Sequence, residues 1–194
     1  IESLNTILNS SNQKITAIVG GNKIDDKLQM LDNLSKKINN IYIAGNNINA
    51  YNDKKEFINK LNNNKANIIL MKDGFGNTDK NETPLYINSC LDKKDDQKIF
   101  DIGPKSLCEL HNLIGNSDII FWNGTLGIVE DNFYKYGSEM LINFLNYSNK
   151  KIIIGGGDTA GFVNNYSNNF YHVSTGGGAS IEYLSNGYLI GMKK

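Results

Sequence analysis

Residues 151–159 read KIIIGGGDT, so a short apolar run leads directly into three glycines, an aspartate and a threonine. A continuous apolar run of this length is typical of a strand that is buried on both faces of a parallel sheet. The glycines allow a ligand to approach the backbone, and a helix that starts after them offers N–H groups to an anion. This stretch therefore predicts a strand, a tight turn and a helix, the unit from which α/β folds are built.

Similar apolar runs alternate with helical patterns along the chain. The other strand candidates are residues 15–19, 41–44, 68–71, 99–102, 119–122 and 171–173. Apolar residues spaced three and four apart predict helices over residues 24–38, 104–114 and 133–145. We expect a doubly wound α/β fold (Rossmann-like), with a mainly parallel sheet, helices on both faces and a single domain over residues 1–194. The polar stretches 74–83 and 92–98 are expected to be surface loops.

The charge composition narrows the possible functions. The chain has 20 basic and 20 acidic residues, and every basic residue is a lysine. A neutral balance argues against a nucleic-acid binder, and the absence of arginine removes the planar bidentate clamp for phosphates. Any phosphate site must therefore use lysine, backbone N–H groups and helix N-termini.

The sequence also suggests a cellular setting. Cys90 and Cys108 lack metal-ligand spacing, and no signal peptide or membrane-spanning apolar run is apparent. We expect a cytoplasmic monomer without nucleic-acid or membrane partners. Because the chain begins at Ile1 rather than at a methionine, we expect an excised domain or a processed product.

Glycines follow four of the strand candidates, where open α/β sheets bind their ligands. The four motifs are GGNKIDDK at 20–27, WNGTLG at 122–127, GGGDT at 155–159 and STGGGAS at 174–180. The third motif has two interpretations, a phosphate-binding loop or a tight turn between a strand and a helix. Two glycine runs that each open a helix, the third and fourth motifs, favour phosphate binding.

Charged residues in these motifs indicate what the ligand could be. A carboxylate beside a phosphate is repulsive unless a cation lies between them, so Asp158 suggests a magnesium-nucleotide; alternatively, it is a helix N-cap. Lys23 and Lys27 are four residues apart, on one face of a helix that starts near residue 24. They could bind a phosphate chain, or form a solvated face that nearby aspartates balance. Residues 155–160 also match the dinucleotide pattern GxGxxG/A loosely, which leaves a dinucleotide-dependent oxidoreductase as a further alternative.

In this order, the four motifs resemble the C-terminal, nucleotide-binding half of phosphoglycerate kinase. That family carries GGAKxxDK, then WNGPxG with a glutamate soon after, then GGGDT and STGGGA. Residues 101–104 (DIGP) also match its DxGP turn. The resemblance covers nearly the whole chain, from Gly20 to Ser180.

The resemblance implies a function. The family transfers a phosphoryl group reversibly between 1,3-bisphosphoglycerate and ADP, giving 3-phosphoglycerate and ATP in glycolysis. By this resemblance Lys27 would contact the nucleotide phosphates, Lys23 the phosphoryl group in transfer and Glu130 the ribose hydroxyls, while Asp158 would hold Mg²⁺. The implied catalytic residues are Lys23, Gly157 and Gly178. The implied nucleotide-binding residues are Gly20, Gly21, Lys27, Asn123, Gly127, Glu130, Gly155, Gly156, Gly157, Asp158 and Thr159.

The chain departs from the family pattern in several places. Thr125 replaces a proline, residues 45–48 (GNNI) stand where the family has a glycine-rich run against adenine, and residues 99–100 replace another glycine-containing part of that pocket. These substitutions leave the phosphate end intact, and they leave both the affinity for adenine and the preference for adenine or another base open. His111 and His172 are interpreted as structural.

The larger difference is that nothing in the chain corresponds to the family's arginine-rich N-terminal domain, which binds 3-phosphoglycerate. We expect the chain to bind Mg-ADP or Mg-ATP but to be inactive or poorly active alone. The alternative is a stand-alone nucleotide-binding module without kinase activity.

Overall fold

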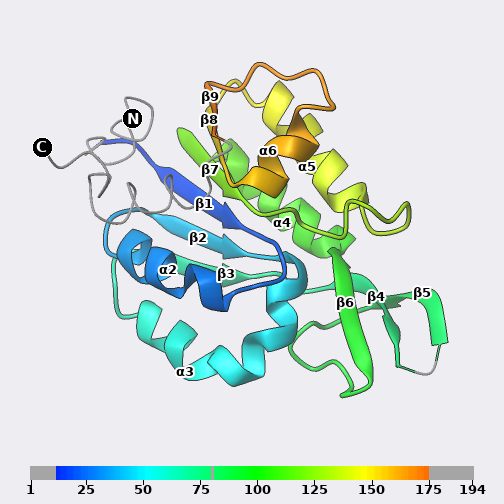
Figure 1. Ribbon diagram of the computed structural model, residues 1–194. Helices are drawn as coiled ribbons and strands as arrows, with labels where there is room; N and C mark the ends of the chain where they lie inside the picture. Colours follow the sequence, from blue (N-terminus) through cyan, green and yellow to red (C-terminus); the bar gives the residue numbers. More distant parts are fainter. Residues whose placement is uncertain (1–11, 80, 175–194) are drawn as a thin grey trace, which may run out of the picture.

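A six-stranded parallel sheet forms the centre of the computed structural model, which describes residues 12–79 and 81–174 (Figure 1). Its strands are β1 (Ile15–Val19), β2 (Asn40–Ile43), β3 (Asn67–Leu70), β7 (Ile119–Asn123), β8 (Lys151–Gly155) and β9 (His172–Ser174). They lie in the order β3-β2-β1-β7-β8-β9, and every neighbouring pair is parallel. The predicted doubly wound α/β fold is confirmed.

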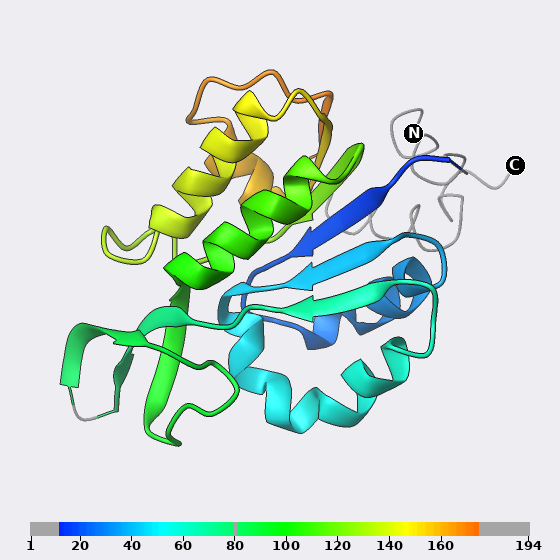
Figure 2. The same cartoon turned by 180° about the vertical axis from the view of Figure 1, so that it is seen from behind.

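Helices cover both faces of this sheet (Figures 1 and 2). One face packs on α2 (Leu28–Ser35) and α3 (Tyr51–Leu61), and the other on α4 (Pro104–Gly115), α5 (Tyr136–Tyr147) and α6 (Gly157–Val163). The side chains of successive strand residues point to opposite faces of the sheet. Ala17 and Val19 therefore pack in the core beneath α2 and α3, while Ile18 packs in the core beneath α4, α5 and α6. Apolar side chains are needed on both faces, which explains the continuous apolar runs of the sequence.

The order of the strands locates the place where a ligand can bind. The chain runs outward from β1 through β2 to β3, then returns to place β7 on the other side of β1. The connections that leave the carboxyl ends of β1 and β7 therefore diverge, and open α/β sheets bind ligands in the crevice at such a switch point.

A second, antiparallel sheet lies between β3 and α4 and corrects two expectations. It consists of β4 (Gly74–Thr78), β5 (Asn81–Ile87) and β6 (Gln97–Ile102), in the order β5-β4-β6. Residues 74–83 and 92–98 are thus not simply surface loops, and residues 99–102 do not belong to the parallel sheet. The sheet is polar because only a few of its apolar residues, such as Ile87 and Ile99, reach the core.

The helices also differ in part from the predictions. The segment predicted as one helix over 24–38 is a 3-10 helix, η1 (Asp25–Lys27), followed by α2. Helix α5 begins three residues later than predicted and buries Leu141, Ile142 and Leu145, whereas Tyr136 and Met140 are exposed. Helix α3 escaped prediction because it is polar and buries only Ile58 and Leu61. Among the described residues, no helix has the length and apolar character that crossing a membrane requires.

Candidate functional site

Three glycine loops meet where β1, β7 and β8 end. The N–H of Gly20 donates to the carbonyl of Asn123 at 2.9 Å, which ties the loop after β1 to the loop after β7. The N–H of Gly124 donates to Thr159 Oγ1 at 2.7 Å, which ties the loop after β7 to the start of α6. The predicted first, second and third motifs therefore form one site, although residues 28–121 separate the first from the second in the sequence.

Glycine is required where the first two loops touch. A Cβ atom on Gly20 would lie 2.2 Å from the carbonyl oxygen of Thr125, and one on Gly124 would lie 2.2 Å from the carbonyl oxygen of Gly20. Gly124 also has a φ of 91°, which side chains disfavour. The two loops can approach this closely only because neither residue carries a side chain.

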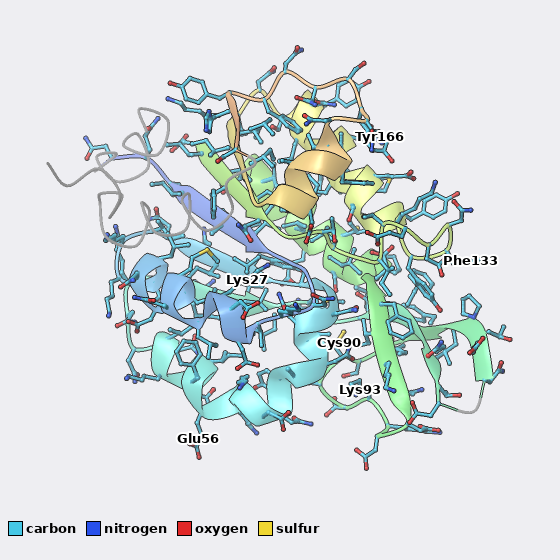
Figure 3. All side chains as sticks on the ribbon, viewed as in Figure 1. Lys27, Glu56, Cys90, Lys93, Phe133 and Tyr166 are labelled. Atoms are coloured by element: carbon cyan, nitrogen blue, oxygen red, sulfur yellow. The ribbon has the colours of Figure 1, made fainter. Side chains whose placement is uncertain are left out.

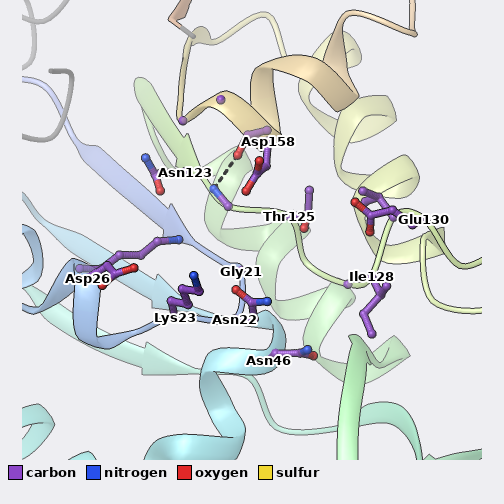
Figure 4. A pocket seen from close by; sticks show the side chains of 17 residues that line it. Gly21, Asn22, Lys23, Asp26, Asn46, Asn123, Thr125, Ile128, Glu130 and Asp158 are labelled. Atoms are coloured by element: carbon purple, nitrogen blue, oxygen red, sulfur yellow. Dashed lines mark hydrogen bonds between the residues drawn. The ribbon is translucent and has the colours of Figure 1, made fainter. Parts of the chain in front are cut away.

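A cavity of about 360 Å³ opens between these loops (Figure 4). It is lined by 17 residues, most of which belong to the three motifs. The lining consists of Gly21, Asn22, Lys23, Asp26, Lys27, Asn46, Asn123, Gly124, Thr125, Gly127, Ile128, Val129, Glu130, Gly156, Gly157, Asp158 and Thr159. Cationic, amide and backbone donors thus surround a space that is large enough for a small-molecule ligand.

Lys27 extends across the floor of the site, in the centre of the molecule (Figure 3). Its Nζ donates to the carbonyl of Gly20 and lies close to Gly21 and Gly124. Burial lowers the pKa of Lys27 to about 8, although the negative charges of Asp158 and Asp26 counteract part of this shift. An anion in the cavity would stabilise the ammonium form and restore a higher pKa.

Asn123 supplies a donor that has no partner. Its side chain is 3 % exposed, and its Nδ2 forms no hydrogen bond within the described part of the chain. The atom lies beside Gly155 and Gly156, at the entrance to α6. Because an unpaired buried donor is unfavourable, this amide is suited to a ligand that brings an acceptor.

The N-terminus of α6 faces the same cavity. Gly156, with a φ of 101°, is the N-cap residue, and no side chain caps the helix in the residues that the structure describes. The alternative interpretation of Asp158 as the N-cap is therefore wrong. Asp158 lies instead in the first turn, exposed and pointing into the cavity (Figure 4).

The carboxylates of the cavity determine which kind of metal ion it can hold. Asp158, Asp26 and Glu130 line it, but the described residues contain no cluster of three or more potential ligands that could hold a metal by themselves. Magnesium commonly binds through one or two carboxylates together with phosphates and water. The residues present therefore fit magnesium that arrives with a phosphate ligand, and they do not fit an all-protein metal site.

The structure brings most of the predicted site residues together. The ten that line the cavity are Gly21, Lys23, Lys27, Asn123, Gly127, Glu130, Gly156, Gly157, Asp158 and Thr159. Gly20 and Gly155 lie behind the lining, where a Cβ would strike Thr125 and Phe121 respectively. Gly178 and the rest of the fourth motif beyond Ser174 lie outside the described residues.

Several lining residues were not predicted as site residues. Asn22, Asp26, Thr125, Ile128 and Val129 lie within or next to the first and second motifs, so position in a motif was the available signal. For Asn46, the signal was its location in the segment that departs from the family pattern.

Known proteins are similar to this chain in sequence and in fold. The family model of phosphoglycerate kinase matches residues 1–187. The phosphoglycerate kinase of Borrelia garinii is 32 % identical over 212 residues, which cover 98 % of this chain and 54 % of that protein. The phosphoglycerate kinase of Buchnera aphidicola is 33 % identical over 200 residues, with 95 % and 51 % covered.

Solved structures agree with these matches. The phosphoglycerate kinase structure from Coxiella burnetii aligns with a TM-score of 0.85 and 25 % identity over 97 % of this chain and 54 % of that one. The chain therefore spans about half the length of the relatives that it matches.

Proposed function

The chain belongs to the phosphoglycerate kinase family, and on this premise we propose that it is the nucleotide-binding half of such an enzyme. It binds Mg-ADP or Mg-ATP in the cavity and serves reversible phosphoryl transfer between 1,3-bisphosphoglycerate and ADP. The observation that carries the proposal is the position of Lys27. Its ammonium group is partly dehydrated and lies against two glycine loops. These loops and the open N-terminus of α6 line the same cavity.

The charged end of the cavity suits a phosphate chain. Lys27 supplies a positive charge that burial has already stripped of much of its water, so pairing with a phosphate has a smaller dehydration cost. The N–H groups at the start of α6 and the unpaired Nδ2 of Asn123 add neutral donors. These groups can neutralise and orient phosphates without arginine, which the chain lacks.

The reaction requires positioning more than proton transfer. An oxygen of the terminal phosphate of ADP attacks the acyl phosphate, the new O–P bond forms, and the carboxylate of 3-phosphoglycerate leaves with the electrons of the broken O–P bond. The attacking oxygen is already ionised near neutral pH, so no general base is needed. Lys23 lies at the exposed side of the cavity, where its ammonium group can stabilise the negative charge of the phosphoryl group during transfer.

Magnesium would be held by Asp158 together with the nucleotide phosphates, and its charge would reduce their repulsion. Asp158 lies near enough to Lys27 to raise the pKa of the lysine. This carboxylate is thus well placed to hold a cation against a phosphate that Lys27 also contacts. Glu130, at the rim, is suited to accept hydrogen bonds from ribose hydroxyls.

Calorimetric titration of Mg-ADP into the chain tests the proposal. We expect saturable binding below millimolar concentration, and Lys27→Met should weaken it by roughly 30-fold because a buried charge pair is lost. Lys55→Met, at an exposed position of α3, is the matched control and should leave the affinity unchanged. Absence of binding at millimolar nucleotide would contradict the proposal, and so would equal affinity of the two variants.

A further inference from the structure

The two ends of the cavity differ in chemistry. Lys23, Lys27 and Asp158 line the charged end. Figure 4 shows Asn46 in another part of the cavity, away from Asp158 and below Ile128. On the proposed function, phosphates at the charged end leave the flat base of the nucleotide for this less charged end. An apolar side chain such as Ile128 can pack against the face of a base, but only polar groups can distinguish one base from another.

Asn46 belongs to a 3-10 helix, η2 (Gly45–Ala50), in which the two neighbouring asparagines have structural roles. Asn47 Nδ2 donates to the carbonyl of Gly20 at 2.8 Å. Asn49 Nδ2 donates to the carbonyl of Ile99 at 2.7 Å, and its Oδ1 accepts from the N–H of Ile99 at 3.0 Å. These contacts tie η2 to the first glycine loop and to β6, so the fold explains why both residues are asparagine.

Asn46 has no such role. Its Oδ1 is buried without a hydrogen-bond partner in the described part of the chain, yet the residue lines the cavity. Asn47 Oδ1 is also unpaired, but Asn47 does not line the cavity and its Nδ2 is bound. Because no bond holds Asn46 Oδ1, the amide can turn about Cβ–Cγ without breaking one and can offer either atom to a ligand.

We propose that Asn46 is a specificity-determining residue that reads the 6-amino group of a purine base and favours adenine over 6-oxo purines. The inference rests on the proposed function. On its N7 edge adenine presents a donor, the 6-amino group, beside the acceptor N7, and one carboxamide matches this pair with its own acceptor and donor. On the same edge of a 6-oxo purine both O6 and N7 are acceptors, so Asn46 Oδ1 finds no donor whichever way the amide turns.

Titration of the chain with Mg-ADP and with Mg-inosine diphosphate tests this, because on the N7 edge the two bases differ only at position 6. We expect wild type to bind ADP about three- to tenfold more tightly, the scale of one net hydrogen bond. Asn46→Leu keeps the approximate volume, removes both polar atoms and should bring the ratio of the two affinities close to one. Asn62→Leu, an exposed residue at the end of α3, is the matched control and should keep the wild-type ratio.

A second readout needs no variant. In a ¹⁵N-labelled wild-type chain, the side-chain NH₂ resonances of Asn46 should shift more with ADP than with inosine diphosphate. A role of Asn46 in packing alone would produce no such difference between the two ligands.

The outcomes separate the two proposals. Equal affinities of wild type for both nucleotides, or an unchanged ratio in Asn46→Leu, would overturn base reading and leave nucleotide binding standing. If both nucleotides and inorganic pyrophosphate fail to bind at millimolar concentration, the proposed function fails and base reading fails with it.

Discussion

Helices α4 and α6 both begin beside the carboxyl end of a strand, but their N-terminal N–H groups differ in whether a side chain binds them. At α4, the buried carboxylate of Asp73 accepts from the N–H of Ser106 at 2.8 Å and from the N–H of Lys105 at 3.1 Å. At α6, no side chain caps the first turn in the described part of the chain, and the turn faces the cavity. The fold closes one helix end with its own charge, and we propose that the other end receives an anion from outside.

Helix α5 extends the comparison. Its second residue, Gly137, donates its N–H to Asp101 Oδ2 at 2.9 Å, so this end is also closed by a buried carboxylate. The two carboxylates differ, however. Burial raises the pKa of Asp101 to about 7, whereas hydrogen bonds from Ser106 and Tyr86 outweigh burial at Asp73 and lower its pKa. The ionised carboxylate at α4 therefore contributes to stability, that at α5 counts against it, and the open end of α6 is expected to contribute to binding.

The largest expected effect concerns Asp101. Its pKa is about 7 in the folded chain and near 4 in the unfolded chain, so between these values the folded chain holds a proton that the unfolded chain has released. Stability should therefore fall as pH rises from 4 to 8, by up to about 4 kcal/mol. Asp101→Asn cannot ionise and should remove this part of the pH dependence, as urea unfolding at several pH values can measure.

Asp95→Asn, at an exposed position, is the matched control and should follow wild type. An identical fall in stability for wild type and Asp101→Asn would show that Asp101 does not ionise unfavourably in the folded chain.

The next effect concerns the closed end of α4. Asp73 also accepts hydrogen bonds from Ser106 Oγ at 2.6 Å and from Tyr86 Oη at 2.7 Å, so Asp73→Ala leaves several buried donors unpaired. We expect a loss of about 3 kcal/mol in the free energy of unfolding. Asp73→Asn keeps an acceptor and should lose less. A loss below about 1 kcal/mol in Asp73→Ala would mean that the cap contributes little.

A third prediction concerns the cation at the open end. In the free chain the pKa of Lys27 is about 8, and a bound phosphate would raise it. Above pH 8 the free lysine must first take up a proton, so the affinity for Mg-ADP should fall roughly tenfold between pH 7 and pH 9. Lys27→Met should bind weakly but with a flat profile over this range. A steep profile in that variant would assign the pH dependence to another group.

The smallest effect concerns Asp158. Because its charge raises the pKa of Lys27, Asp158→Ala should shift the midpoint of the pH profile below 8. The variant should also lose the magnesium dependence of ADP binding, which we expect to be roughly threefold in wild type, the scale of a partly screened charge pair. Titrations with and without Mg²⁺ measure both effects. Full retention of the magnesium dependence would reject the proposed role of Asp158.

A contrast between apolar and polar elements explains how far the sequence could predict the fold. The strands of the parallel sheet are apolar on both faces, so runs such as residues 152–154 were recognisable. The small sheet alternates buried glycines with exposed residues such as Phe75, and its pattern resembles a polar loop. Helix α3 was missed for a similar reason, because little of its surface reaches the core.

The candidate site was predictable in its glycines and lysines but not in its amides. Glycines followed by Lys27 or Asp158 indicate phosphate chemistry by residue type alone. The role of Asn46 depends on which asparagines of η2 the fold already uses, and only the hydrogen bonds of Asn47 and Asn49 reveal that. Likewise, the absence of a partner for Asn123 Nδ2 is a property of packing and not of sequence.

The most direct test is an amide titration of the ¹⁵N-labelled chain with Mg-ADP, observed by two-dimensional NMR. The account predicts that the backbone N–H resonances of Gly157, Asp158 and Thr159, in the open first turn of α6, shift and saturate. The N–H resonances of Lys105 and Ser106, which Asp73 already holds, should stay in place. Saturable binding that leaves the α6 amides unmoved would contradict the account.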